Sequence, residues 1–202
     1  MINKLKEAFR IINTGYTEIK FRRLLLPNVT ELIHSEDSSV HWKHLNVEHK
    51  TILDLGCGLW GVSDIKETSP VYFKNKGAKK IIGVDMNAND IAYFNTYFKD
   101  NFKNDESVFL VKKITGTKDL TDLIDKYKVE SIKCDIEGFE KVLFNISKSQ
   151  LKNIGSISVE YHNHALFLKL VNTFNNWDFK IDNHSIFTYG SRNMGVLTAS
   201  KK

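Results

Sequence analysis

From about residue 50 onward, short apolar runs alternate along the chain with longer amphipathic segments. This alternation is typical of buried strands joined by helices, which together build a mainly parallel sheet. The same pattern predicts two further strands close to the C-terminal end. The predicted strands cover residues 51–55, 80–85, 107–113, 131–136, 156–162, 179–183 and 195–200.

Helix signals separate these strands. Ser69-Pro70 predicts a helix start with Ser69 as its cap, and Gly77 predicts the end of that helix. Further helices are predicted over residues 89–99, 120–127 and 165–174.

The first fifty residues follow a different pattern. Residues 2–12 have the apolar spacing of a helix, and Thr30 is placed to cap a short helix that runs through Leu32 and Ile33. No linker, repeat or low-complexity tract divides the rest of the chain. We therefore expect a single domain over residues 1–202, with an N-terminal cap region over 1–49 and a Rossmann-like core over 50–202.

Composition fits a soluble globular protein. The chain has 202 residues, of which 42% are hydrophobic and 26% charged, and this is enough for one buried core. Its net charge of +5 could favour anionic partners, but the basic residues are scattered among acids and form pairs such as Arg22-Arg23 and Lys112-Lys113. We read the charge as a solvated surface and do not expect a nucleic-acid partner.

The cysteine content and the N-terminal segment indicate the cellular compartment of the protein. Cys57 and Cys134 form no C-x-x-C pair and are too few for a disulfide framework, which favours a reducing environment. Charged residues interrupt the first ten positions, so no apolar signal core is present, and no segment has the length of a membrane span. The sequence therefore predicts a cytoplasmic protein with no membrane insertion.

Acidic residues stand at or near the ends of four predicted strands. They are Asp54, Asp85, Asp135 and Glu160. In open parallel sheets, ligands bind in the crevice at the carboxyl ends of the strands. We therefore expect these four carboxylates around one ligand-binding crevice.

The glycine loop GCGLWG, residues 56–61, follows the first core strand and formally matches a dinucleotide-binding motif. Two features favour S-adenosylmethionine instead. Asp54, in the strand immediately before the loop, would repel a pyrophosphate and attract the ammonium of a methionine group. A pyrophosphate-binding helix should also open at the last glycine, whereas VSDIKETS separates Gly61 from Pro70. Asp85, at the end of the second core strand, is placed to accept hydrogen bonds from ribose hydroxyls.

Four segments in order, DLGCGLWG, TSPVYFKNKGAKKIIGVD, LTDLIDKYKVESIKCDIEGFE and ISVEYH, resemble motifs of the FkbM family of S-adenosylmethionine-dependent methyltransferases. The resemblance runs from about Thr51 to about Lys180, and D-x-E-G-x-E is its most specific element. It implies a class I methyltransferase fold, with a seven-stranded, mostly parallel sheet and helices on both faces. It also implies methylation of a hydroxyl oxygen.

Residue by residue, the resemblance implies roles in cofactor binding. Asp54 and the glycine loop would hold the methionine end, Asp85 the ribose, and the segment around Thr115 and Gly116 would lie near the adenine. Asp85-Met86 replaces the Glu-Pro that is usual in the family, and VSDIKE is an apparent insertion that leaves the place of Trp60 open. The predicted cofactor contacts are Asp54, Gly56, Cys57, Gly58, Asp85, Met86, Thr115, Gly116 and Asp135.

The predicted catalytic residues are Asp135, Glu137, Glu160 and His162. Asp135 ends its strand and should lie nearest the reactive methyl group. Glu160 and His162 alternate with their neighbours and so share a face, where His162 could act as general base. The four side chains would also suit a hard divalent ion, but no spacing rule makes this specific, so no metal is predicted.

Two other function classes stay open at this point. The basic isoelectric point of about 9.0 would suit a methyltransferase acting on RNA or another nucleic acid. A non-catalytic cofactor-binding or interaction module is the third possibility, although the acid-rich crevice argues against it. The acceptor, expected to be a small-molecule, glycan or lipid hydroxyl, and the oligomeric state are not set by the sequence.

Overall fold

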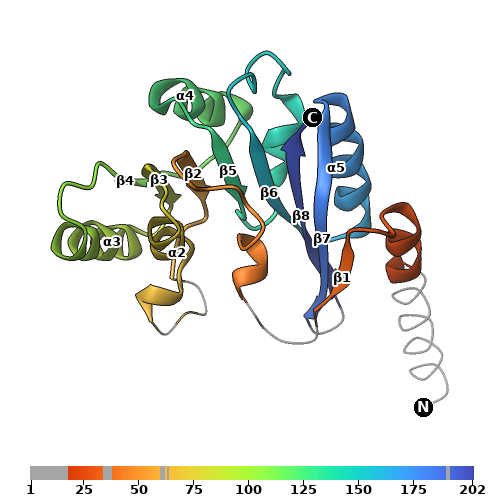
Figure 1. Ribbon diagram of the computed structural model, residues 1–202, viewed down its shortest axis with the longest axis horizontal. Helices are drawn as coiled ribbons and strands as arrows, with labels where there is room; N and C mark the ends of the chain where they lie inside the picture. The colour runs from red at the N-terminus through yellow and green to blue at the C-terminus, as the bar shows by residue number, and fades with distance from the viewer. Residues whose placement is uncertain (1–17, 34–37, 60–61, 63, 190–191) are drawn as a thin grey trace.

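The structure is a computed structural model that describes residues 18–33, 38–59, 62, 64–189 and 192–202 (Figure 1). The predicted helix over residues 2–12 and the position of Trp60 lie outside these residues. The described residues form a central sheet of eight strands in the order β1-β7-β8-β6-β5-β2-β3-β4. The strands are β1 (Thr30–Leu32), β2 (Thr51–Leu55), β3 (Lys80–Asp85), β4 (Val108–Val111), β5 (Ser131–Cys134), β6 (Ser156–Tyr161), β7 (Phe179–Tyr189) and β8 (Arg192–Lys201).

Most strand pairs are parallel, and the strand order reverses direction at β2. Strands β4, β3, β2, β5 and β6 form a parallel run. Strand β8 pairs antiparallel with both β6 and β7, and β1 is parallel to β7. The predicted α/β fold with a mostly parallel sheet is therefore confirmed, with eight strands in place of the expected seven.

The additional strand is β1, and it corrects the prediction of a short helix capped by Thr30. The helical residues 18–25 precede Pro27, and the Thr30 hydroxyl donates to the Leu26 carbonyl at 2.7 Å. The chain then extends, and Thr30 pairs with His184 of β7. A strand of three residues is too short to show a period-two pattern, so no local pattern predicts it. The region before residue 50 thus contributes a strand to the sheet.

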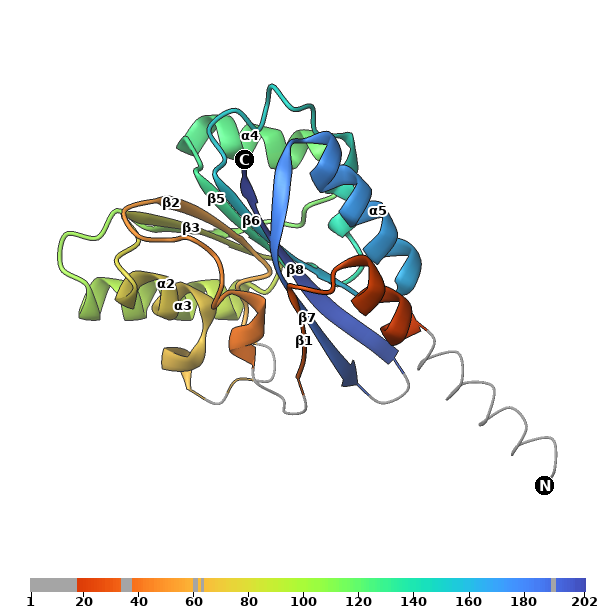
Figure 2. The ribbon, with the colours of Figure 1, turned by 45° about the vertical axis from the view of Figure 1, so that its right-hand side comes forward.

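Helices cover both faces of the sheet, as predicted. In Figure 2, α2 (Ser69–Asn75) and α3 (Ala88–Asn101) lie on one side, and α4 (Thr117–Tyr127) and α5 (His164–Asn176) lie on the other. Short 3-10 helices are η1 (Ser38–His41), η2 (Ile65–Glu67) and η3 (Glu140–Asn145). No helix in the described part of the chain combines the length and apolar character needed to cross a membrane.

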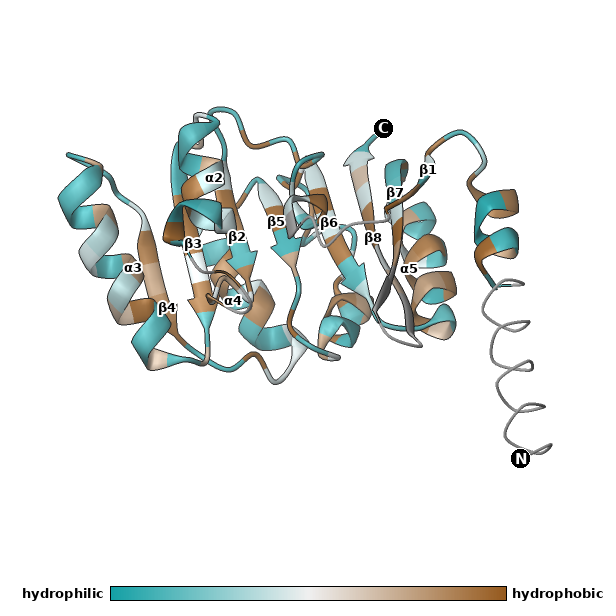
Figure 3. Cartoon of the chain, turned by 90° about the horizontal axis from the view of Figure 1, so that it is seen from below, coloured by the Kyte–Doolittle hydropathy of each residue, from teal (hydrophilic) through white to brown (hydrophobic). Residues whose placement is uncertain are grey.

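Two hydrophobic cores follow from this arrangement, one on each face. Strand β2 feeds both, because its side chains alternate between the faces: Leu53 and Leu55 pack with α4 and α5, while Ile52 packs with α2 and α3. Figure 3 shows the resulting concentration of hydrophobic residues along the central strands. Burial on both faces explains why these strands are continuous apolar runs, and it leaves polar side chains to gather at the strand ends.

Candidate functional site

A cavity of about 350 Å³ lies where β2, β3, β4 and β5 end, beside the point at which the strand order reverses. Open α/β sheets bind their ligands at this kind of position. The cavity is lined by Gly56, Gly58, Val84, Asp85, Met86, Asn87, Asp90, Lys112, Lys113, Ile114, Asp135, Ile136, Glu137 and Phe139. Six of the predicted site residues therefore share one cavity: Gly56, Gly58, Asp85, Met86, Asp135 and Glu137.

The glycine loop passes very close to its neighbours. Gly56 has a φ of +74°, and a β-carbon there would lie 1.7 Å from the carbonyl oxygen of Asp135. A β-carbon on Gly58 would lie 2.8 Å from the Asp85 carboxylate. Glycine is needed at the first position for its backbone angle and the close approach, and at the second for the approach alone.

Backbone N–H groups of this loop are already used within the protein. Gly58 N donates to Asp85 Oδ2 at 3.0 Å, and Leu59 N donates to Asp90 Oδ2 at 2.9 Å. The second oxygen of Asp85 accepts from Asn87 N at 2.8 Å. Two carboxylates thus occupy the amides that would otherwise cradle a phosphate, which supports the argument against a pyrophosphate at this loop.

Asp54 does not line the cavity. Its side chain is completely buried, accepts a hydrogen bond from Ser69 Oγ at 2.6 Å, and lies 3.3 Å from the ammonium of Lys133. Lys133 also donates to the carbonyl of Gly56 at 2.6 Å. Ser69 is the first residue of α2 rather than its cap, which is Thr68. Asp54 therefore belongs to a buried ion pair that supports the glycine loop from beneath.

The segment after β4 enters the cavity slightly earlier than predicted. The strand ends at Val111 rather than Lys113, and the three residues from Lys112 to Ile114 line the cavity. Thr115 turns away and bonds to Asp119 through both its N–H and its hydroxyl. Neither Thr115 nor Gly116 lines the cavity. Cys57 is also absent from the lining, because its side chain is buried against Gly83.

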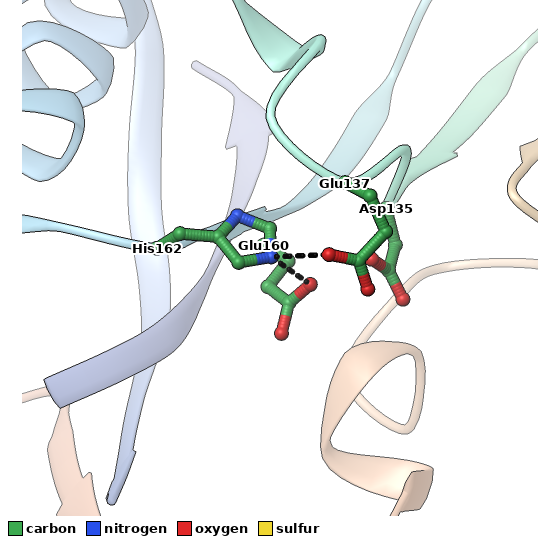
Figure 4. A group of neighbouring side chains, drawn as sticks. All are labelled: Asp135, Glu137, Glu160 and His162. Carbon is green, nitrogen blue, oxygen red and sulfur yellow. Dashed lines mark ion pairs between the residues drawn. The ribbon is translucent and has the colours of Figure 1, made fainter. Parts of the chain in front are cut away.

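Next to the cavity, the predicted catalytic residues Asp135, Glu137, Glu160 and His162 come together in what we call the carboxylate–histidine cluster (Figure 4). Asp135 and Glu137 follow β5, and Glu160 and His162 lie at the end of β6. His162 Nε2 lies 3.1 Å from Glu160 Oε2 and 3.4 Å from Glu137 Oε2. Glu160 and His162 themselves do not line the cavity.

The charges of the cluster depend on burial and on close neighbours. Burial raises the pKa of Glu160 to about 9, and the nearby Asp135 carboxylate adds to the rise. Burial also opposes ionisation of Asp135, but Lys133 and His41 outweigh it and hold the pKa of that carboxyl below its usual range. The interaction with the Glu160 carboxylate raises the pKa of His162 to about 9. At neutral pH the Glu160–His162 pair therefore keeps at least one proton.

This protonation bears on the general base expected at His162. A protonated imidazole has no free lone pair and can only donate hydrogen bonds. In this state His162 cannot take a proton from an acceptor hydroxyl. The carboxylates of Asp135 and Glu137, which reach the cavity, are better placed for that role.

Several residues of the site were not singled out from the sequence. Lys133 is buried in the middle of β5, and its charge inside the apolar run SIKCDI was the available signal. Asp90 follows the helix cap Asn87 and reads as an ordinary acidic residue in a first helical turn. His41, 3.3 Å from Asp135, comes from the N-terminal region, which no local pattern connects to the site.

No protein-family model matches the sequence, and no curated protein matches it either. Solved structures do match. Sp1610 from Streptococcus pneumoniae, a proposed tRNA (m1A22) methyltransferase, superposes with a TM-score of 0.57 at 12% identity, over 84% of this chain and 71% of that one. TrmK from M. capricolum, in complex with S-adenosyl-homocysteine, gives 0.56 at 13% identity, over 85% and 70%.

A third match is precorrin-6y C5,15-methyltransferase from Geobacter metallireducens, with a TM-score of 0.51 at 13% identity, over 85% of this chain and 92% of that one. At identities this low, the likeness concerns the fold. The chain therefore has the Rossmann-like fold found in these methyltransferases, and nothing in the matches singles out the FkbM family.

Proposed function

We propose that the protein is an S-adenosylmethionine-dependent methyltransferase that acts on a hydroxyl oxygen. The observation that carries the proposal is the cavity at the strand-order reversal, where Asp85 and the glycine loop stand beside an acidic cluster. The structural neighbours add support, since TrmK holds S-adenosyl-homocysteine on the same fold. The hydroxyl acceptor is proposed from the resemblance to the FkbM family.

The nucleoside would bind between the ends of β3 and β4. Each carboxylate oxygen of Asp85 accepts one backbone N–H, and each has a second lone pair for a ribose hydroxyl. Met86, with 73% of its surface exposed, and Ile114 provide apolar surface for the adenine on either side. Thr115 and Gly116 would then lie at the outer edge of this contact.

The methionine end would lie over the glycine loop and point toward Asp135. Asp54 acts from below: through Lys133 it holds the Gly56 carbonyl and limits the movement of the loop. Lys133 also lies 3.8 Å from Asp135 Oδ2, which keeps that carboxylate ionised at the cavity wall. An ionised carboxylate there can attract the ammonium and sulfonium charges of the cofactor.

In the reaction, a lone pair of the acceptor oxygen attacks the methyl carbon of the sulfonium. The new O–CH₃ bond forms as the S–CH₃ bond breaks, and the sulfur keeps the bonding electron pair as a neutral thioether. The hydroxyl proton passes to a carboxylate of the cluster. Holding acceptor and cofactor in line supplies much of the rate enhancement.

Methylation of RNA is the alternative that a specific observation favours, because Sp1610 on the same fold is a proposed tRNA methyltransferase. Lys112 and Lys113 at the cavity could contact phosphates. Binding of a generic RNA that persists at about 200 mM salt would support this alternative, since weak contacts to a basic surface vanish under such conditions. Loss of binding at that salt supports a small hydroxyl acceptor.

Calorimetric titration with S-adenosyl-homocysteine tests the proposal. We expect binding of one equivalent per chain and no detectable binding of NAD. Asp85→Ala should weaken S-adenosyl-homocysteine binding by roughly 1.5–3 kcal/mol, because it removes a charged acceptor of hydrogen bonds. Asp100→Ala, at an exposed position of α3, is the control and should bind like the wild type.

Binding of NAD in preference to S-adenosyl-homocysteine would overturn the proposal. Unchanged S-adenosyl-homocysteine affinity in Asp85→Ala would show that the nucleoside lies elsewhere. A non-catalytic module would bind the cofactor normally yet transfer no methyl group to any acceptor.

A further inference from the structure

The carboxylate–histidine cluster holds more acidic groups than nearby basic side chains can balance. In the described part of the chain, no lysine or arginine forms an ion pair with Glu137, Glu140 or Glu160; each of them pairs with His162 alone. Asp135 pairs with His41 at 3.3 Å and with Lys133 at 3.8 Å, and Lys133 lies closer to Asp54, at 3.3 Å. Buried carboxyl groups without basic partners either hold protons or bind a further cation.

The donor atoms of the cluster converge on one point. One ligand atom from each of Asp135, Glu137, Glu160 and His162 lies within 4.8 Å of the other three. Figure 4 shows the carboxylates and the imidazole ring directed toward one another from the ends of β5 and β6. The Glu160 side chain is only 4% exposed, so its carboxylate is directed into the cluster and away from solvent.

The surroundings of His162 provide a second observation. Its Nε2 faces the cluster, while Nδ1 lies 3.7 Å from Glu140 Oε1 on the opposite side of the ring. The Glu140 side chain is completely buried, and neither its Oε2 nor either ring nitrogen of His162 has a hydrogen-bond partner within the described structure. A carboxylate behind a histidine that presents its other nitrogen to an acidic pocket is the usual support of a metal-binding imidazole.

We propose that the cluster binds one divalent cation through the carboxylates of Asp135, Glu137 and Glu160 and through Nε2 of His162. Three oxygens and one imidazole nitrogen suit a first-row ion of the Mn²⁺ kind, which accepts both donor types, better than Mg²⁺ or Ca²⁺, which prefer oxygen alone. The ion would displace the protons that the cluster otherwise holds. Glu140 would then accept the Nδ1–H of His162 and fix the ring.

Binding requires a small contraction of the cluster. Ligands on opposite sides of an ion with bonds of about 2.1 Å are about 4.2 Å apart, whereas the ligand atoms here lie within 4.8 Å of one another. Glu137 can supply this movement, because its side chain is 75% exposed and it follows a strand end. The more buried Glu160 and His162 form the fixed side of the site.

The position suggests what the ion would do. Asp135 and Glu137 also line the cavity, so the remaining coordination positions of the ion would face the space in which the acceptor is expected. There the ion could hold the acceptor oxygen beside the methyl group and increase the acidity of its hydroxyl. This role rests on the proposed function, whereas the binding of the ion does not.

Titration of Mn²⁺ into tag-free, chelator-treated protein, followed through the electron paramagnetic resonance signal of the free ion, tests the site. We expect one ion per chain. Glu137→Gln should weaken this binding at least tenfold and should fold normally, because the side chain is largely exposed. Asp122→Asn, which removes an exposed carboxylate paired with Lys118, is the matched control and should leave Mn²⁺ binding unchanged.

Glu140→Gln separates a metal site from simple attraction to surface charge. This buried residue contacts the ring and not the ion, and loss of such support typically weakens metal binding by about 10- to 100-fold. Circular dichroism should confirm its fold. Absence of stoichiometric Mn²⁺ binding to the wild type, or equal binding by the wild type, Glu137→Gln and Glu140→Gln, would overturn the proposal.

The metal site and the proposed function can fail separately. If S-adenosyl-homocysteine binds and Mn²⁺ does not, the cluster is a metal-free part of a methyltransferase. If Mn²⁺ binds and S-adenosyl-homocysteine does not, the metal site stands and the methyltransferase proposal falls.

Discussion

Asp54 on β2 and Glu160 on β6 are both buried acidic residues near strand ends, yet their surroundings differ. Asp54 is matched by Lys133 and Ser69, and its side chain contributes nothing to the cavity wall. Glu160 has only His162 as an ion-pair partner in the described structure, and other carboxylates surround it. The same residue type thus supports the fold in one place and remains available to a ligand in the other.

The difference shows which acidic residues at the strand ends are available to bind a ligand. A buried carboxylate with its own ammonium and hydroxyl partners is largely balanced within the protein and has less to gain from a ligand. A buried carboxyl group that is surrounded by other carboxyl groups stays protonated or binds a cation. The side chains that contact a carboxylate, rather than its position at a strand end, therefore distinguish structural from ligand-binding residues.

The largest expected effect comes from breaking the balanced pair. Lys133→Met leaves Asp54 buried without its cation and should lower the free energy of unfolding by about 3–5 kcal/mol. Urea denaturation measures the loss. Lys50→Met, which removes a partly exposed pair with Glu130, is the control and should cost about 1 kcal/mol or less.

A double variant sharpens this test. Asp54→Asn combined with Lys133→Met removes both charges and should recover much of the stability lost in Lys133→Met alone. If Lys133→Met is as stable as the control, then Asp54 is not held by Lys133, and the contrast with Glu160 disappears.

The next effect concerns the glycine loop, where the two carboxylates Asp85 and Asp90 are held by backbone amides. A methyl group at Gly58 would meet both within 2.9 Å, so Gly58→Ala should displace them and weaken S-adenosyl-homocysteine binding at least tenfold. Gly116 has no atom within 4 Å of the added carbon, and Gly116→Ala should stay within about twofold of the wild type. Calorimetry on the two variants decides; similar affinities would remove the loop from the binding site.

The smallest effect is expected within the cluster. Without metal, burial raises the pKa of Glu160 and favours its neutral form, and Glu160→Gln replaces that form with a neutral group of similar shape. The free energy of unfolding should change by about 1 kcal/mol or less, in contrast to Lys133→Met. Urea denaturation in the presence of a chelator measures this. A loss as large as that of Lys133→Met would mean that Glu160 is a structural residue like Asp54.

The sequence predicted the central part of this molecule well, because its strands are buried on both faces and read as apolar runs between clear helix signals. Asp85 and Asp135, selected because they end two of those runs, both line the cavity. It could not predict β1, whose three residues pair with a strand about 150 positions further along the chain. Local patterns carry no information about such distant pairing.

The site was predicted less completely, for a related reason. Whether an acid at a strand end faces a cavity depends on which side chain of a neighbouring strand reaches it. Lys133 on β5 pairs with Asp54, and Thr115 bonds to Asp119 in the first turn of α4 instead of lining the cavity. The cluster itself was predicted, since its members lie at the ends of two strands whose adjacency follows from the fold.

The structure of the protein with S-adenosyl-homocysteine bound is the most direct test of the account. We predict the ribose at Asp85, the adenine between Met86 and Ile114, and the sulfur directed past the glycine loop toward Asp135 and Glu137. A complex in which S-adenosyl-homocysteine occupies another surface, or in which its sulfur points away from the carboxylate–histidine cluster, would contradict the proposed function.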